Sequence, residues 1–183
     1  MKGELRHCYG GEFFIMPRFP LASLPASGFQ KGSGARWFGS SRGGGRKHAA
    51  CDLIAKKGTP IYAVASGLVI EKHYFYHDTW ALVVDHIFFT VRYGEIEKKL
   101  AEGVEVGSSV VEGQHIANVG LLSGGSSMLH FEMYNGDGVG KLTQKSNHND
   151  YYYVPSANYQ RRSDLLDPTP FLEQWAMITP GIF

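Results

Sequence analysis

Short runs of apolar and β-branched residues fill the middle of the chain, and glycine or polar residues separate them. Runs of this length and composition are typical of strands in an antiparallel sheet. Ser66-Gly67, between the first two runs, indicates a hairpin. The pattern therefore predicts a mostly β fold built around an antiparallel sheet. The runs cover 60–65, 68–70, 81–86, 88–93, 104–107, 110–116 and 129–134.

Two segments have a helical composition. Glu97–Glu102 is too short to be stable alone, so we expect one or two turns packed against the sheet. Thr169 and Pro170 have the pattern of an N-cap and a first helical residue, which predicts a C-terminal helix over about 170–178. Residues 135–158 are polar and rich in tyrosine, and there we expect an extended loop. The expected fold thus has short peripheral helices and a C-terminal helix.

The length and composition fit one domain. A chain of 183 residues with 43% hydrophobic content can bury one core of good size but not two. Glycine, serine and arginine dominate 25–45, which predicts a surface loop. We expect a loop-rich N-terminal extension over 1–35 and a single domain over 36–183.

The charge balance and the apolar runs exclude two kinds of partner. A formal net charge of +1 leaves no field that could hold nucleic acid. No run approaches the ~18 apolar residues of a membrane span. No signal-peptide core can be read near the start either, because Pro17, Arg18 and Pro20 interrupt the apolar stretch. We therefore expect a protein made in the cytoplasm, which would act outside it only after non-classical delivery.

His48 and Asp52 are the first candidates for chemistry. A spacing of four residues puts both side chains on one side of the chain, whether the backbone is extended or helical. They could hold one metal ion together with a further ligand from elsewhere in the chain. The pair alone fits equally a surface histidine beside an aspartate that caps a turn.

Several motifs in order resemble the lysostaphin/LytM zinc peptidases. Arg46–Leu53, with the strands that follow Gly58-Thr59-Pro60, resembles the first metal motif of that family. Gly103–Gly120 resembles the segment ahead of the second motif, and Met128-Leu129-His130-Phe131-Glu132 resembles the second motif itself. The resemblance continues to Asp167-Pro168 and Phe171-Leu172, so it covers about 36–172. It implies an antiparallel LytM-like peptidase domain.

Position by position, the resemblance makes His48, Asp52 and His130 the ligands of a zinc ion. It implies an endopeptidase that hydrolyses peptide cross-links or stem peptides of bacterial peptidoglycan with a zinc-activated water. Non-classical delivery to the periplasm or cell wall by a secretion machine or a phage particle, as for an antibacterial effector, would then be needed. A module that keeps its metal without turnover and binds cell wall or a partner protein is the alternative.

Two positions depart from the family pattern. The family has a second histidine where this chain has Met128, which should lie beside His130 on the strand. The family's other catalytic histidine falls in a Tyr-x-His-Leu stretch, and the matching residues here are Tyr93, Gly94, Glu95 and Ile96. Since a carboxylate beside a zinc-activated water can accept a proton and pass it on, Glu95 is the candidate general base. The alternative is a solvated charge or a partner for Arg92 or Lys98.

The remaining candidates surround this set. His86 is a second catalytic candidate, although its place in an apolar strand fits a hydrogen-bonded core histidine as well. Glu132 shares the strand face of His130 and could orient that ligand, or it could face solvent. Tyr93 and Met128 are expected beside the metal or the substrate. Cys51 has the opposite parity to Asp52 and should point into the core.

Overall fold

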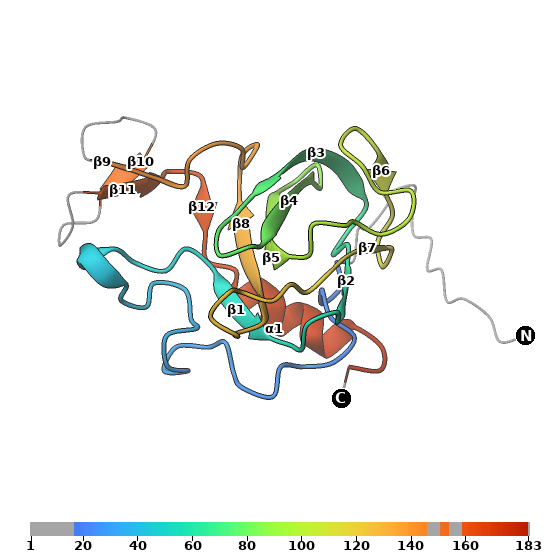
Figure 1. The fold of residues 1–183 in the computed structure, drawn as a ribbon, viewed down its shortest axis with the longest axis horizontal. Coiled ribbons are helices and arrows are strands. Elements are labelled where there is room, and N and C mark those ends of the chain that lie inside the picture. The colour runs from blue at the N-terminus through green and yellow to red at the C-terminus, as the bar shows by residue number, and fades with distance from the viewer. Residues whose placement is uncertain (1–16, 146–150, 154–158, 183) are drawn as a thin grey trace, which may run out of the picture.

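A computed structural model describes residues 17–145, 151–153 and 159–182 of this protein. A seven-stranded, wholly antiparallel sheet lies at its centre (Figure 1). Its strands run in the order β1-β8-β5-β4-β3-β6, and β12 pairs with β8 next to β1. The strands are β1 (Cys51–Ile54), β3 (Gly67–Tyr74), β4 (Trp80–Asp85), β5 (Thr90–Ile96), β6 (Ser109–Val110), β8 (Met128–Tyr134) and β12 (Leu165–Leu166).

Smaller elements surround this sheet. Two short strands, β2 (Pro60–Tyr62) and β7 (His115–Asn118), pair with each other. A three-stranded sheet consists of β9 (Thr143–Lys145), β10 (Tyr151–Tyr153) and β11 (Tyr159–Arg162), and it lies at the same end of the molecule as the single turn of 3-10 helix η1 (Gly43–Gly45) (Figure 1). Helix α1 (Thr169–Ile178) is the one α-helix in the described part of the chain.

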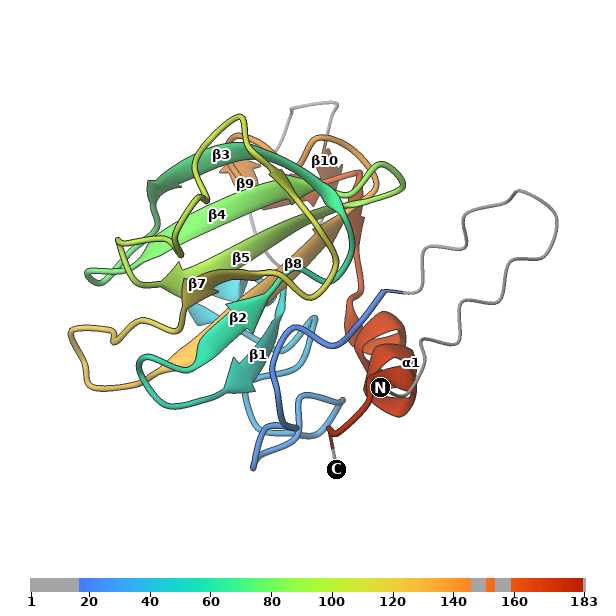
Figure 2. The ribbon, with the colours of Figure 1, turned by 90° about the vertical axis from the view of Figure 1, so that its right-hand side faces the viewer.

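The two faces of the central sheet have different roles because side chains alternate along each strand. One face carries Tyr93 and Phe131, whose rings pack edge to face, and Trp175 of α1 packs against Phe131. This is the hydrophobic core, which α1 covers (Figure 2). Cys51 lies on the core face and is fully buried. The other face carries Asp52 and His130, which are register partners on β1 and β8.

The expected fold class is confirmed: the domain is mostly antiparallel β with a helix at its C-terminal end. The predicted N-cap was wrong by one residue. Thr169 is already helical, Pro168 occupies the N-cap position, and the Thr169 backbone N–H donates to Asp167 Oδ1 at 2.9 Å. No helix in the described residues is both long and apolar enough to cross a lipid bilayer.

The predicted hairpin at Ser66-Gly67 does not form. β2 pairs with β7, whereas β3 pairs with β4 and β6, so the two runs belong to different sheets. Gly67 is required for another reason: a Cβ atom there would lie 2.3 Å from the carbonyl oxygen of Asp85. Close approach of two backbones, which glycine permits, explains this residue better than a turn does.

The helical turn predicted over Glu97–Glu102 is absent. The backbone N–H groups of Glu97 and Ala101 instead donate to the carbonyls of Asn118 and Ile116, so the segment runs along β7. A single turn could not compete with these bonds. The strand predicted over 104–107 is absent, and a turn at 106–107 precedes β6 instead. Of the strand predicted over 110–116, only residue 110, in β6, and residues 115–116, in β7, are extended, because a turn at 112–113 separates the two strands.

Two further predictions concern segments that the structure describes in part. Within the expected loop 135–158, residues 143–145 and 151–153 form strands, while 146–150 and 154–158 lie outside the described residues. Of the expected extension 1–35, residues 1–16 lie outside them. The rest packs onto the domain: Phe19 is fully buried, and its backbone N–H donates to Thr179 Oγ1 at 2.8 Å.

Candidate metal centre

Three donor atoms from distant parts of the chain converge on one point. His48 Nε2 lies 3.1 Å from Asp52 Oδ1, and His130 Nδ1 lies 2.8 Å from the same oxygen. The two ring nitrogens are 3.4 Å apart. This is the one group of three or more metal-binding side chains found in the described residues. The sequence resemblance selected the same three side chains.

The backbone explains why these side chains meet. Asp52 and His130 are direct partners across β1 and β8, so their side chains leave the same face of the sheet side by side. His48 precedes β1 in an extended segment, held by a bond from its backbone N–H to the carbonyl of Ser40 at 2.8 Å. A spacing of four residues returns its ring to the face of Asp52.

Each imidazole has its other ring nitrogen fixed. His48 Nδ1 lies 3.1 Å from the carbonyl oxygen of Trp37, and His130 Nε2 lies 2.9 Å from Glu132 Oε1. Since a carbonyl or a carboxylate can only accept, these nitrogens carry the protons. When a metal ion takes the place of the protons at the convergence point, the lone pairs of His48 Nε2 and His130 Nδ1 would face it, which is the tautomer a metal ligand needs.

The donor set fits zinc. Two imidazoles and one carboxylate form a ligand set found in catalytic zinc sites, with the fourth position left to water or substrate. A tetrahedral ion with bonds of about 2.1 Å separates its ligand atoms by about 3.4 Å, close to the spacing of these three atoms. No rearrangement of the backbone is needed to bring them to that spacing.

A buried polar chain orients His130. Glu132 is fully buried and accepts hydrogen bonds from Arg92 Nη1 at 3.0 Å and from the Tyr134 hydroxyl. Burial alone would raise the pKa of Glu132, but the positive charge of Arg92 and the hydrogen bond from His130 lower it to about 2. Arg92 also donates to the carbonyl oxygen of Gly138 at 2.7 Å. The carboxylate is thus ionised and fixed, and so is the ring it holds.

The charges around the convergence point favour a cation. Burial lowers the pKa of His130, but hydrogen bonds to Asp52 and Glu132 outweigh it and raise that pKa to about 10. Burial also opposes ionisation of Asp52, but its hydrogen bonds to both histidines hold its pKa well below the usual range. Burial lowers the pKa of His48. In the absence of metal a proton takes the position between His130 and Asp52, and a metal ion replaces it on binding.

The comparison with protein families agrees with this site. The model of peptidase family M23 matches residues 46–146, which include all three donors. This chain belongs to peptidase family M23. A comparison with curated proteins found no match.

Solved structures share the M23 fold. Lysostaphin from Staphylococcus simulans, an antimicrobial peptidase, is 20% identical with a TM-score of 0.54, covering 92% of this chain and 54% of its own. The protein cbpa from L. salivarius REN is 23% identical with a TM-score of 0.59, covering 88% and 98%. A zinc containing peptidase from Vibrio cholerae is 26% identical with a TM-score of 0.50, covering 65% and 36%. This M23 chain thus spans between about a third and a half of lysostaphin and the Vibrio protein.

Glu95 lies beside the metal centre at an irregularity of β5. Ala81 pairs with Gly94 and Trp80 pairs with Ile96, so Glu95 is the extra residue of a β-bulge. Its φ of 60° is in the left-handed region, a conformation that costs a non-glycine residue on the order of 1 kcal/mol or more. Residues held this way are common at active sites.

Glu95 is buried, with only 2% of its surface exposed, and its carboxyl group contacts a tyrosine that lines the pocket. The Tyr76 hydroxyl donates to Glu95 Oε1 at 2.9 Å, and Oε2 has no hydrogen-bond partner among the described residues. Burial raises the pKa of Glu95, although the nearby charge of His130 and the bond from Tyr76 act against this. Glu95 is therefore a carboxyl that can hold or release a proton close to the metal.

A pocket of about 410 Å³ opens above the metal ligands. His48, His130 and Glu132 line it, with Phe75 and Tyr76 of the β3–β4 loop, and the Phe75 ring lies 5.3 Å from the His130 ring. Arg42, Arg46, Lys47 and Arg161 also line it, as do Ala49 and Leu142. The metal centre is thus reached through a groove with aromatic and basic walls.

The other predicted site residues separate into two groups. Met128 lies two residues before His130 on β8 and so shares its face, as expected. His86 and Tyr93 lie together on the core face: His86 Nε2 is 3.1 Å from the Tyr93 hydroxyl, and His86 Nδ1 is 3.2 Å from the carbonyl of Ser66. The structure does not bring these two to the metal ligands.

Sequence reasoning missed Tyr76 and Arg42. Tyr76 belongs to the loop between β3 and β4, where an aromatic residue carries no motif that distinguishes it. Arg42 Nη2 donates to Asp52 Oδ2 at 3.3 Å and so fixes the carboxylate oxygen that is turned away from the two histidines. The composition of the loop 25–45 indicated only a surface segment that could frame a site.

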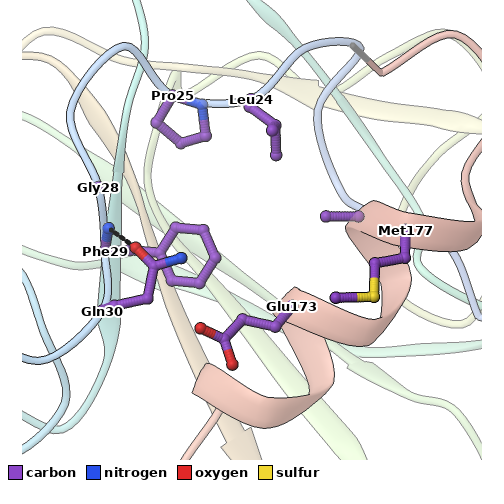
Figure 3. Close-up of a pocket in the computed structure, with 8 residues that line it drawn as sticks. Leu24, Pro25, Gly28, Phe29, Gln30, Glu173 and Met177 are labelled. Carbon is purple, nitrogen blue, oxygen red and sulfur yellow. Dashed lines mark hydrogen bonds between the residues drawn. The ribbon is translucent and has the colours of Figure 1, made fainter.

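A second cavity, of about 460 Å³, lies between the N-terminal loop and α1. Figure 3 shows Leu24 and Pro25 on one side of it and Glu173 and Met177 of α1 on the other. Glu173 is the one ionisable group among the residues that line it, so it offers no set of groups for hydrolysis.

Proposed function

We propose that this M23 chain is a zinc-dependent endopeptidase that hydrolyses peptide bonds in the cross-links or stem peptides of bacterial peptidoglycan. The observation that carries the proposal is the convergence of His48 Nε2, Asp52 Oδ1 and His130 Nδ1 at the floor of an open pocket. The shared fold with lysostaphin and the likeness to a zinc containing peptidase support it.

Zinc held by these three residues would supply Lewis-acid chemistry, since it lowers the pKa of a water molecule and polarises a carbonyl. His48, Asp52 and His130 would bind the ion and leave one side of it open to the pocket. Trp37 and Glu132 orient the two rings through the bonds to their second nitrogens. Such fixed partners typically strengthen metal binding 10–100-fold.

Glu95 and Tyr76 would handle the proton. Glu95 Oε2 has no hydrogen-bond partner among the described residues and can accept the proton that the attacking water loses. The Tyr76 hydroxyl lies between Glu95 and the pocket, where its oxygen can accept a hydrogen bond from the substrate amide. The same proton then passes to the leaving amine. The strained backbone at Glu95 is consistent with a side chain held for this purpose.

A second candidate is a metal-retaining module that binds cell wall or a partner protein without hydrolysis. Two observations favour it. Met128 shares the face of His130 and cannot transfer a proton. Glu95 is buried behind Tyr76 rather than open to the pocket.

Digestion of purified peptidoglycan, with mass analysis of the released products, separates these candidates. We expect the zinc-loaded wild type to release peptides and His130→Ala to lose both zinc and activity. Glu95→Gln should keep zinc and lose activity by 10²-fold or more, as expected for a general base. Glu97→Gln, one residue beyond the end of the same strand, is the matched control and should remain active.

Zinc binding without any released product from the wild type would refute the peptidase proposal and support the binding module. If Glu95→Gln retained full activity, the role of Glu95 as general base would be refuted, but the proposed metal centre would not be affected. Tyr76→Phe removes only the hydroxyl, so a reduced rate in that variant would separate its role from the packing of its ring.

A further inference from the structure

A glycine turn places two cations at the rim of the metal pocket. Ser41 and Lys47 form an isolated bridge, and the Arg42 backbone N–H donates to the carbonyl of Arg46 at 2.9 Å. Between them, Gly44 and Gly45 have φ values of 72° and 75°, which two consecutive side-chain-bearing residues would rarely adopt. The turn therefore holds Arg46 and Lys47 beside His48. We call these two residues the basic edge.

The basic edge is not neutralised by any of the described residues. Arg46 is exposed and donates through Nε to the carbonyl of Gly43 at 3.0 Å, and its two terminal guanidinium nitrogens have no hydrogen-bond partner in the described part of the chain. Lys47 Nζ contacts Ser41 Oγ at 3.3 Å. Neither side chain forms an ion pair with any residue in the described part of the chain. Both line the pocket.

The other charges at the pocket are compensated. Arg42 pairs with Asp52, and Glu132 pairs with Arg92 and His130. The whole chain carries a net charge of only +1, so this local excess of cations is a property of the pocket rather than of the surface at large. A groove of this kind attracts an anion.

We propose that the basic edge binds a carboxylate of the substrate, so that the enzyme acts on acidic peptides and not on neutral glycine bridges. This inference rests on the proposed function. Guanidinium and ammonium groups bind carboxylates through charge-assisted hydrogen bonds, and a guanidinium can do so with two parallel bonds. Stem peptides carry free carboxylates, whereas a bridge made only of glycine carries none between its ends.

The place of the carboxylate follows from the residues that line the pocket. Arg46 and Lys47 line the same pocket as His48 and His130, so the anionic group would be bound in the pocket that contains the cleaved bond. Phe75 and Tyr76 line the same pocket and offer apolar contact to the rest of the peptide.

The test compares matched synthetic peptides with the full, zinc-loaded chain. One is a cross-linked stem peptide with free carboxylates, the second is the same peptide with those groups amidated, and the third is pentaglycine. The variant is Arg46→Gln/Lys47→Gln. The control is Lys56→Gln/Lys57→Gln, which removes two exposed charges that do not line the pocket. Arg42 is left intact because it pairs with Asp52.

We expect the wild type to have a KM about tenfold lower for the acidic peptide than for its amidated form, because two charge-assisted contacts are lost on amidation. The Arg46→Gln/Lys47→Gln variant should lose this preference through KM, with kcat unchanged, while the control keeps it. Higher salt should reduce the preference of the wild type, since exposed charges are screened.

Calorimetric binding of the same peptides makes failure of the inference distinguishable from failure of the proposed function. Suppose that the wild type hydrolyses nothing but binds the acidic peptide about tenfold more tightly than the amidated one, and that the double variant shows no such difference. The role of the basic edge would then be supported and the peptidase proposal refuted. Equal binding or equal cleavage of the acidic and amidated peptides would overturn the inference. Better cleavage of pentaglycine than of the acidic peptide would overturn it too.

Discussion

At the scale of single residues, His130 has a carboxylate on each of its two ring nitrogens. Asp52 lies 2.8 Å from Nδ1 and Glu132 lies 2.9 Å from Nε2. These contacts raise the pKa of His130 to about 10 against the effect of burial, so a metal ion must displace a tightly held proton at neutral pH. The apparent affinity for zinc therefore rises with pH. Glu132 keeps the ring in place throughout, because it bonds the nitrogen that does not face the metal.

His86 provides a prediction at the same scale. Burial lowers the pKa of His86 from 6.5 to about 4, so between these values the unfolded chain binds more protons than the folded one. The contribution of His86 to the free energy of unfolding is therefore complete above about pH 6.5 and is lost as the pH falls towards 4. Between pH 6.5 and 4, we expect the free energy of unfolding of the wild type to fall more than that of His86→Gln. The difference between the two losses should be up to about 3 kcal/mol.

Denaturant unfolding at about pH 7 and pH 4, with a chelator present, measures this difference for the His86→Gln variant. His115→Gln changes an exposed histidine and serves as the control, which should behave like the wild type. An identical loss of stability in wild type and His86→Gln would show that His86 is not the buried neutral imidazole that the structure places beside Tyr93.

At the scale of elements, close backbone contacts shape the strands around the metal. Gly94 faces His130 across β5 and β8, where a Cβ atom would lie 3.2 Å from the His130 side chain. Gly120 approaches the backbone of Ile96 so closely that a Cβ atom would lie 2.9 Å from it, and its N–H donates to the carbonyl of Glu95 at 2.8 Å. The bulge at Glu95 is thus held from two sides.

Gly67 gives the prediction at this scale. In Gly67→Ala the new Cβ would lie 2.3 Å from the carbonyl oxygen of Asp85, so β3 must move away from β4. We expect the free energy of unfolding to fall by about 2 kcal/mol or more, in the range of other overpacking changes. Gly124→Ala is the control, because nothing lies within 4 Å of its Cβ position and its φ is not in the left-handed region.

Chemical denaturation of both variants tests the Gly67 prediction. The Gly124→Ala variant should stay within about 0.5 kcal/mol of the wild type, as surface substitutions usually do. If Gly67→Ala were as stable as Gly124→Ala, the close approach of β3 and β4 at this point would be contradicted.

At the scale of the whole molecule, the metal ligands join the segment before β1 to β8, which is distant in sequence although it is next to β1 in the sheet. An ion bound by His48, Asp52 and His130 binds only the folded chain well, because the unfolded chain separates these residues. A ligand at about 100 times its Kd adds about 2.7 kcal/mol to the free energy of unfolding. In a domain of this size we expect zinc to raise the Tm by about 5–10 °C.

Thermal melts with zinc and with a chelator measure the effect of the metal. His130→Ala is the matched control, since it lacks a ligand and its Tm should not respond to zinc. A wild-type Tm that is the same with zinc and with chelator would contradict a bound ion at these three residues.

Local patterns predicted the sheet, because short apolar runs separated by glycine or polar residues mark strands. The resemblance to the lysostaphin/LytM peptidases predicted the three donor residues, since the spacing of His48 and Asp52 alone left their role open. The neighbours of the site could not be predicted in the same way. Tyr76 meets Glu95 only because the β3–β4 loop folds back over the sheet, and the bulge at Glu95 exists only once β4 and β5 pair.

The errors in element boundaries have one physical origin. Glu97–Glu102 has a helical composition, but long-range bonds to β7 replace the local bonds of a helical turn. Ser66-Gly67 has the composition of a hairpin, but Gly67 serves a contact with Asp85 that is distant in sequence. In both cases a partner far along the chain decided the conformation, and a local pattern contains no information about that partner.

The position of Cys51 determines how its thiol reacts with oxidants and alkylating reagents. Its thiol is buried on the core face of β1, and burial raises its pKa to about 12. Oxidants and alkylating reagents attack the thiolate, which is essentially absent at neutral pH when the pKa is so high. Cys51 is next to Asp52 in sequence, but its side chain lies on the opposite face of the sheet. Its sulfur therefore does not compete for the metal ion and is not expected to be oxidised or reduced by the solution. We therefore expect oxidants or reductants in solution to leave this thiol, and the adjacent ligand Asp52, unchanged.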